Sequence, residues 1–169
     1  MAFGENAAEP HHEPNHRTLE EGDIVKLDFG AVTGGYHADM TRTVAFGEPA
    51  AELRRIHDLV RRAQRAGIDA VRAGVGGAEC DLAARAVIEE AGYGERYSHS
   101  LGHGVGLEIH EGPALRKTSE DVLPAGTVVT VEPGVYVPGL GGVRIEDMVE
   151  VTESGAREIP RSTKELVVV

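Results

Sequence analysis

Acidic residues interrupt four runs of the sequence that otherwise predict β-strands. Asp28 and Asp39 stand in alternating runs on either side of Thr33–Gly35, and Glu132 and Glu146 stand in two β-branched runs nearer the C-terminus. The interior of a sheet rarely keeps a carboxylate that is not paired, protonated or bound to a cation. The chain must therefore fold so that four strands bring carboxylates to places where their charge is offset.

The first two runs predict a β-hairpin, with glycine supplying the positive φ of the turn. A turn centred near Thr33 and Gly34 would place Asp28 almost opposite Asp39. Two facing carboxylates repel, so the pair forms either an ordinary solvated face or a cation site. Because side chains alternate along a strand, we expect the acids to face away from an apolar layer. That layer would contain Val25, Leu27, Phe29 and Ala31.

Residues 124–132 and 142–151 predict a second strand pair, joined by the Gly/Pro-rich connection 133–141. Glu132 ends its strand, and Glu146 is expected in mid-strand with Arg144 on the same face. Between the two pairs, residues 49–73 and 78–91 have the apolar spacing of helices. This order of elements predicts an α+β domain with both helices on one face of a curved antiparallel sheet.

Three histidines lie within twelve positions in the segment from His99 through His103 to His110. Glycines separate them and permit close approach of the backbone to a ligand. A single histidine here would be read as an ordinary hydrogen-bonded side chain. Three of them, in a chain that also places four acids in strands, favour a binding site.

Residues 28–43, 99–111 and 131–147 together resemble the pita-bread metallopeptidases, and among these most of all the Xaa-Pro aminopeptidases and dipeptidases. The resemblance covers essentially the whole chain and implies the pita-bread (creatinase/aminopeptidase-like) fold. It implies an exopeptidase that hydrolyses the peptide bond before proline through a metal-bridging hydroxide. Methionine aminopeptidases are an alternative, but they usually lack the stretch found at residues 138–144. Aminopeptidase and dipeptidase activity both stay open.

The resemblance also implies two divalent metal ions. Asp28 would hold one, His103 and Glu132 mainly the other, and Asp39 and Glu146 would bridge both. Four carboxylates offset the charge of two divalent cations. A donor set rich in oxygen with one imidazole suits Mn²⁺, Co²⁺, Fe²⁺ or Zn²⁺, and Mn²⁺ is the family expectation.

Further site residues follow from the same resemblance. His99 and His110 would lie near the substrate, one at the scissile carbonyl and the other near the intermediate or leaving group. Glu132 would act as a general base. Arg144 would hold a bridging carboxylate such as Asp39, touch the substrate, or only balance charge.

Two weaker candidates complete this set. His11 aligns with a substrate-contacting histidine of the family, although His12 and His16 lie close by. Tyr136 is expected to support or contact the substrate site. The implied partner is a peptide that contains proline.

Composition limits the remaining possibilities. With 169 residues, the chain is expected to form a single catalytic domain over residues 1–169. A net charge of −11 argues against nucleic acid as a partner. The single cysteine, Cys80, excludes a disulfide framework, and no apolar stretch is long enough to cross a membrane, so we expect a cytoplasmic protein.

The family repeats a unit of two helices followed by strands, and this sequence aligns from within the first unit. We therefore expect an N-terminally incomplete domain that lacks the first helical pair. Part of the apolar layer would then be exposed, which favours a homo-oligomer or a complementing N-terminal fragment. A catalytically silent binding or interaction module on the same scaffold is the alternative to an enzyme.

Overall fold

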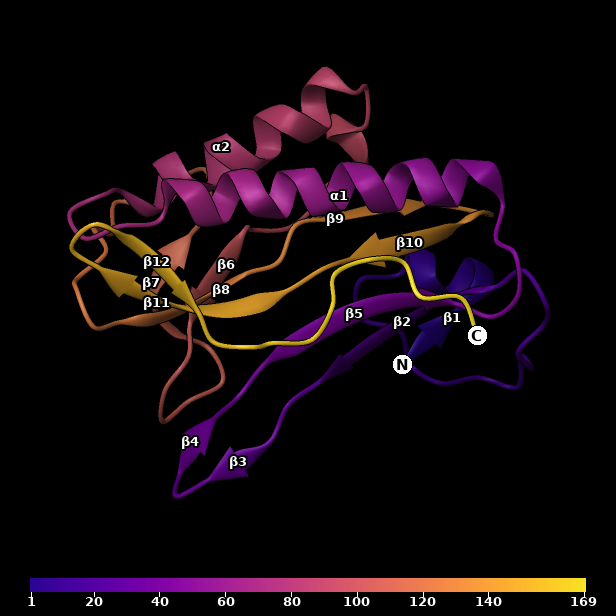
Figure 1. Cartoon of the computed structure of the whole chain (residues 1–169), viewed down its shortest axis with the longest axis horizontal. Helices are drawn as coiled ribbons and strands as arrows, with labels where there is room; N and C mark the ends of the chain where they lie inside the picture. Colours follow the sequence, from indigo (N-terminus) through magenta and orange to yellow (C-terminus); the bar gives the residue numbers. More distant parts are fainter.

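Two helices and several small antiparallel sheets make up the fold (Figure 1), and the computed structural model describes residues 1–169. The helices are α1 (Ala51–Ala70) and α2 (Gly77–Glu90), with short 3-10 helices at Gly4–Ala8 and Gly94–Arg96. The strands are β1 (Ala2–Phe3), β2 (Ile24–Phe29), β3 (Val32–Thr33), β4 (Tyr36–His37), β5 (Met40–Ala45), β6 (Gly102–Gly104), β7 (Glu111–Leu115), β8 (Val128–Val131), β9 (Gly134–Val137), β10 (Gly141–Arg144), β11 (Asp147–Thr152) and β12 (Gly155–Glu158). None of the helices is both long and apolar enough to cross a lipid bilayer.

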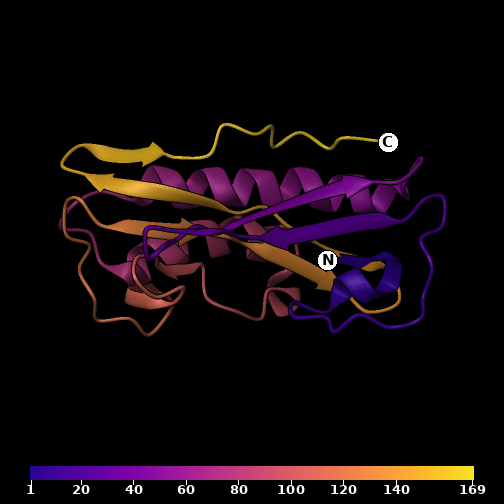
Figure 2. The ribbon, with the colours of Figure 1, turned by 90° about the horizontal axis from the view of Figure 1, so that it is seen from below.

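The strands form one sheet in the order β1-β2-β5 and another in the order β12-β11-β8-β6-β7, with β9-β10 and β3-β4 as separate pairs. Both helices lie on the same side of these strands, and the β3-β4 hairpin projects from the body (Figure 1). Figure 2 shows the C-terminal segment running along one long edge, where Val168 pairs in parallel with Ala45. The expected α+β architecture, with helices on one face of antiparallel strands, is confirmed.

Helix α1 forms because apolar residues recur at helical spacing on one face. That face buries Leu53, Ile56 and Val60 against strand residues that include Ile24 and Val143. A second apolar cluster lies between α2 and the five-stranded sheet. The expected helices at residues 49–73 and 78–91 are each observed: the first is shorter, at Ala51–Ala70, and the second is shifted by one residue, at Gly77–Glu90.

The first hairpin has a different register from the expected one. Its turn lies at Gly34 and Gly35, whose φ angles are 58° and 86°. Both values suit a two-residue hairpin turn that needs two positive φ angles. Asp28 therefore stands opposite Thr41 and not opposite Asp39. A shift of two residues keeps side chains on their faces, so both acids still share one face.

Asp28 does lie on the face of β2 opposite Val25 and Phe29, as expected, but that apolar face is not the inner one. The face of β2 that carries Asp28 is the inner one, because it also carries the fully buried Ile24 and the buried Lys26. The opposite face is the outer one, where Phe29 is 53% exposed. Ala31 is exposed too, whereas Val25 is buried, so the expected exposed patch is confirmed only toward the end of the strand.

The second strand pair is confirmed, but its connection is not a simple loop. β8 pairs with β11, which places Val131 opposite Asp147. Residues 133–141 contain β9, which pairs with β10. Glu146 does not lie in mid-strand: it lies in the break between β10 and β11, where its N–H donates to the carbonyl of Thr41. This hydrogen bond connects the break between β10 and β11 to strand β5 at Glu146.

Candidate metal centre

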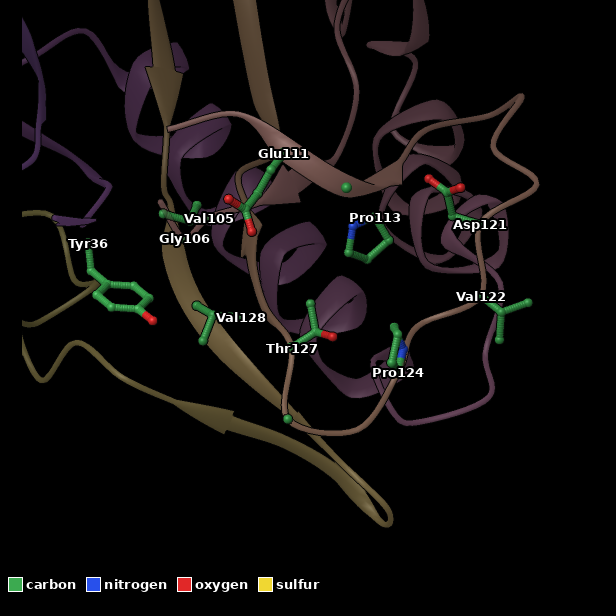
Figure 3. A pocket seen from close by; sticks show the side chains of 12 residues that line it. Tyr36, Val105, Gly106, Glu111, Pro113, Asp121, Val122, Pro124, Thr127 and Val128 are labelled. Carbon is green, nitrogen blue, oxygen red and sulfur yellow. The ribbon is translucent and has the colours of Figure 1, made fainter. Parts of the chain in front are cut away.

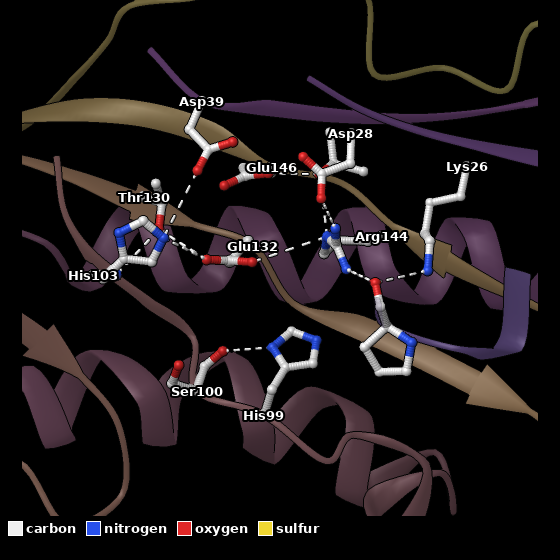
Figure 4. Close-up of polar contacts among 12 residues, drawn as sticks. Lys26, Asp28, Asp39, His99, Ser100, His103, Thr130, Glu132, Arg144 and Glu146 are labelled. Atoms are coloured by element: carbon white, nitrogen blue, oxygen red, sulfur yellow. Dashed lines mark hydrogen bonds and ion pairs between the residues drawn. The ribbon is translucent and has the colours of Figure 1, made fainter. Parts of the chain in front are cut away.

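The five residues expected to bind metal come together from five separate segments. Asp28 lies near the end of β2, Asp39 just before β5, His103 in β6, Glu132 just after β8 and Glu146 between β10 and β11. Figure 4 shows their side chains gathered around a common space. Because most of these positions lie at strand ends or breaks, the carboxylates escape the close-packed interior of the sheets.

Three of the five side chains meet the distance requirement for one ion. Ligand atoms of Asp39, His103 and Glu146 lie within 4.8 Å of one another. His103 Nε2 is also 3.8 Å from Asp39 Oδ2 and 3.3 Å from Glu132 Oε1. Asp28 is not part of this three-residue group and forms an ion pair with Arg144.

The backbone fixes the orientation of the His103 ring. Its Nδ1 donates a hydrogen bond to the carbonyl of Gly104 over 2.9 Å. The other ring nitrogen, Nε2, therefore faces the carboxylates, which is how imidazole ligands of metal ions are usually held. Gly102 is required beside it, because a Cβ there would lie 1.9 Å from the carbonyl oxygen of Thr130.

The pKa values of the carboxylates in the cluster are shifted in different directions. Burial, together with the charge of Glu132 and neighbouring acids, raises the pKa of Glu146 well above its ordinary value, and burial with the charge of Asp28 raises that of Asp39. Burial also acts against ionisation of Glu132, but the hydrogen bond from His103 and nearby cationic charge outweigh it and lower the pKa. The cluster thus holds more negative charge than its own cations offset.

Asp147 and Glu146 are adjacent buried acids, and only Asp147 has cationic partners. Asp147 is fully buried and is offset by Arg42 and Lys164, each 2.6 Å away. Glu146 is also buried, yet its carboxylate receives only the hydroxyl of Thr41, at 2.6 Å. No hydrogen-bond donor of the chain reaches the Asp39 carboxylate within bonding distance. Oxygen donors left unpaired around one imidazole fit divalent cations.

All three guanidinium nitrogens of Arg144 make contacts within the chain. It forms an ion pair with Asp28, donates from Nη1 to Tyr136 Oη at 3.0 Å, and donates from Nε to Thr41 Oγ1 at 3.1 Å. Its Nη1 also reaches the carbonyl of Pro10 at 3.2 Å. Of the roles expected for Arg144, holding an acid fits, but that acid is Asp28 and not Asp39.

His99 and Tyr136 form a linked pair beside Glu132. His99 Nδ1 donates to the carbonyl of Ser100, so its Nε2 accepts from Tyr136 Oη, each over 2.8 Å. Burial lowers the pKa of His99 and raises that of Tyr136 to about 12, so both are neutral near pH 7. With both nitrogens of His99 engaged, its ring has no free donor.

His110 and His11 lie at the opening of the site. The His110 ring meets the His103 ring edge-on with centroids 4.3 Å apart. His11, His99 and His110 all line a pocket of about 260 Å³ that is also lined by the four acids and the His103 imidazole described above. The adjacent His12 instead lies 2.7 Å from Glu9, so the two histidines have different surroundings.

Several supporting residues were not found from the sequence. Asp81 and Arg85 of α2 form a buried ion pair, and Arg85 also donates to the carbonyl of His99 at 2.9 Å. Asp81 accepts from the N–H of Leu101, so α2 holds the segment that carries His99. Asp81 and Arg85 are four residues apart in a predicted helix, and this spacing could have predicted their ion pair from the sequence. Lys26, which is 3% exposed and donates to three carbonyls between residues 7 and 10, has no comparable signal.

A larger pocket than the one at the acidic cluster lies elsewhere. It measures about 590 Å³ and shares no lining residue with the acidic cluster. Figure 3 shows Tyr36 at one end of its opening and Asp121 and Val122 at the other. Pocket size therefore does not single out the acidic cluster, whereas its unpaired carboxylates do.

The fold and the carboxylate-rich site together define a metallopeptidase, and comparisons with known proteins agree. The model of metallopeptidase family M24 matches residues 1–153. The chain is 45% identical to an Xaa-Pro dipeptidase of Pyrococcus furiosus over 167 residues, covering 99% of this chain and 48% of the relative. An Xaa-Pro dipeptidase from Bacillus anthracis superposes with a TM-score of 0.97 at 49% identity, covering 99% of this chain and 47% of that one.

A further neighbour is an X-Pro aminopeptidase from Thermotoga maritima, with a TM-score of 0.96 and 43% identity, covering 99% of this chain and 48% of that one. The chain belongs to metallopeptidase family M24, has its pita-bread fold, and falls in its Xaa-Pro dipeptidase branch. It spans about half the length of the curated relatives it matches.

Proposed function

We propose that this chain carries the catalytic centre of a metal-dependent exopeptidase that hydrolyses the peptide bond before proline. The observation that carries the proposal is the convergence of Asp39, His103 and Glu146 within 4.8 Å, where neither acid has an arginine or lysine partner. Membership of family M24 implies divalent metal ions. The Xaa-Pro dipeptidase names of the relatives support proline-directed cleavage.

Asp28, Asp39, His103, Glu132 and Glu146 would hold two divalent ions, with Mn²⁺ as the expected metal. Such ions, when bound, acidify a water molecule and polarise the carbonyl of the bond to be cleaved. The pocket of about 260 Å³ has room for that bond beside these residues. The charge of four carboxylates would be balanced by the two ions.

The remaining residues have distinct roles in this proposal. Glu132 is ionised at neutral pH because its pKa is lowered, so it can accept a proton as a general base. His110 has no hydrogen-bond partner in the chain and contacts the substrate, as does His11. His99 instead orients Tyr136, because both of its ring nitrogens are engaged. Arg144 fixes Asp28.

The test is turnover by the purified chain supplied with Mn²⁺. Release of the first residue from Xaa-Pro peptides is expected, together with its loss in Glu146→Gln. Xaa-Ala peptides of the same length serve as the control for proline selectivity. Absence of turnover with Mn²⁺, Co²⁺, Fe²⁺ and Zn²⁺ alike would favour the alternative of a silent binding module, and release of methionine from non-proline peptides would favour the methionine aminopeptidase alternative.

A further inference from the structure

Lys26 is a buried lysine that donates hydrogen bonds only to main-chain carbonyls. Its side chain is 3% exposed and lies on the inner face of β2, two residues before Asp28. Its Nζ donates to the carbonyls of Ala7 and Pro10, each over 3.2 Å, and also to the carbonyl of Glu9. Three acceptors match the three N–H donors of an ammonium group. The polar contacts of Lys26 therefore all serve one short stretch of backbone.

That stretch of backbone leads directly to His11. No helix or strand covers residues 9–23, so regular secondary structure does not fix the position of His11. The His11 side chain is exposed and makes no hydrogen bond within the chain, yet it lines the catalytic pocket beside the acidic cluster. The hydrogen bonds to the carbonyls of Glu9 and Pro10 are therefore what fixes the chain just before His11.

Two cationic side chains share the carbonyl of Pro10. Lys26 and Arg144 point toward the same carbonyl oxygen (Figure 4), and each reaches it over 3.2 Å. Lys26 precedes Asp28 by two residues, and Arg144 precedes Glu146 by two residues. The segment that ends at Pro10 is thus hydrogen-bonded to β2 and β10, the two strands that lead into the acidic cluster. A substrate group bound by the next residue would therefore keep a fixed distance from the acids.

We propose that Lys26 is a positioning residue, which holds residues 7–10 so that His11 reaches the substrate; this rests on the proposed function. Lys26 does not line the catalytic pocket, so it acts through His11 and not on the substrate itself. Without Lys26, the carbonyls would lose a buried donor, and the segment would move outward to bind water instead. His11 would leave the pocket, whereas the acids and His103, which lie on other segments, would stay in place.

The first experiment does not depend on catalysis. NMR of the histidine rings is recorded for the metal-free chain and after addition of Mn²⁺, with His11 assigned from His11→Gln. Mn²⁺ should broaden the His11 signal of the wild type, because paramagnetic relaxation falls steeply with distance. Lys26→Met has a side chain of similar length without donors, so its His11 signal should differ in the metal-free chain and broaden less with Mn²⁺. Identical His11 spectra of the wild type and Lys26→Met would overturn the proposal.

Lys164→Met is the matched control. Lys164 also has three side-chain partners, Gln64, Asp147 and Glu158, and none of them lines the catalytic pocket. This variant should leave the His11 signal unchanged even where it lowers the free energy of unfolding. If circular dichroism shows that Lys26→Met does not fold, Lys26→Gln replaces it. Lys26→Gln keeps an N–H donor and should change the His11 signal in the same direction by a smaller amount.

The second experiment separates substrate binding from the chemical step. With Mn²⁺ supplied and Ala-Pro as substrate, Lys26→Met should raise KM at least about fivefold, the equivalent of about one lost hydrogen bond, and change kcat much less. His11→Ala should also raise KM. Adding Lys26→Met to His11→Ala should have no further effect, because both residues act through one contact.

The outcomes distinguish this proposal from the proposed function. Absence of turnover by the wild type with every metal would refute the proposed function, and the metal-free NMR comparison would still decide whether Lys26 holds His11. Turnover with an unchanged KM in Lys26→Met would overturn the role of Lys26 and leave the peptidase proposal intact. Increases in KM that multiply in the double variant would do the same, because they would show that Lys26 acts independently of His11.

Discussion

Glu146 and Asp147 are adjacent buried acids whose partners give them different roles. Asp147 belongs to a structural network with Arg42, Lys164 and Gln64. Glu146 faces other acids and lacks any cationic partner within hydrogen-bond distance. A cation from solution is the group that can balance Glu146, whereas Asp147 is already balanced.

The two acids should respond oppositely to loss of charge. Glu146→Gln is expected to lower Mn²⁺ affinity by about 100-fold or more but leave the metal-free protein at least as stable, because it removes a poorly offset buried charge. Asp147→Asn should lower the free energy of unfolding by about 3 kcal/mol, because Arg42 and Lys164 lose their partner. Calorimetry and urea unfolding in chelator measure the two effects. If both variants changed Mn²⁺ affinity and the free energy of unfolding to the same extent, the different roles of Glu146 and Asp147 would be contradicted.

Thr41 should matter through the groups it touches. Its hydroxyl donates to Glu146 and accepts from Arg144 Nε, so it links two residues of the site. Thr41→Val should lower metal affinity about 10–100-fold, as expected for loss of a hydrogen bond that orients a ligand. Thr152→Val, which removes a hydroxyl bonded to Gly155 far from the site, is the control. Unchanged affinity in Thr41→Val would argue against this orienting role.

At the scale of elements, local patterns predicted both helices and the strands that carry the acids. Helical spacing and alternation are read within one segment, so neither depends on distant contacts. The pairing of β9 with β10 was missed because a Gly/Pro-rich segment has little local strand signal. The inner face of β2 was misassigned because Ile24 and the buried Lys26 are covered by residues distant in sequence. The supporting contacts of Arg144 could not be predicted for the same reason.

The turn of the β3-β4 hairpin allows a direct test of the observed register. Gly35 has a φ of +86°, so Gly35→Ala should lower the free energy of unfolding by about 1 kcal/mol. Thr33→Ala should have a smaller effect, because Thr33 lies in β3 and outside the turn. Urea unfolding of both variants measures the difference. A larger loss for Thr33→Ala would support the turn position expected from the sequence.

At the scale of the whole molecule, exposed apolar side chains gather around the projecting hairpin. Phe29, Val32, Tyr36 and Leu107 are 53%, 59%, 61% and 65% exposed. The N–H of His37 donates to the carbonyl of Gly106, so the hairpin is joined to the loop that carries Leu107. Such a surface favours association between copies of the chain.

Sedimentation velocity should therefore show self-association that increases with protein concentration. Phe29→Ser combined with Tyr36→Ser should shift the equilibrium toward monomer, because it removes two apolar groups from this surface. Leu82→Ser removes an exposed leucine of α2 as the matched control and should leave association unchanged. A wild-type chain that stays monomeric at all concentrations would contradict this expectation.

Stability should depend on pH in a way set by the acidic cluster. Burial and neighbouring charge raise the pKa of Asp39 and Glu146, so the folded protein without metal binds protons that the unfolded chain has already released. Its free energy of unfolding should fall as pH rises from the ordinary carboxyl pKa through the raised values. Metal binds the deprotonated acids, so stabilisation by Mn²⁺ should be greater at about pH 8 than at about pH 5. Urea unfolding at both pH values, with chelator or with Mn²⁺, measures this stabilisation. The same stabilisation by Mn²⁺ at both pH values would contradict the expectation.

Metal content after dialysis tests the central claim most directly. The chain is loaded with Mn²⁺, dialysed exhaustively against metal-free buffer and analysed by mass spectrometry for bound metal. About two equivalents per chain are expected for the wild type, with loss of metal in Asp39→Ala. A folded wild-type chain that retains no metal would contradict the account.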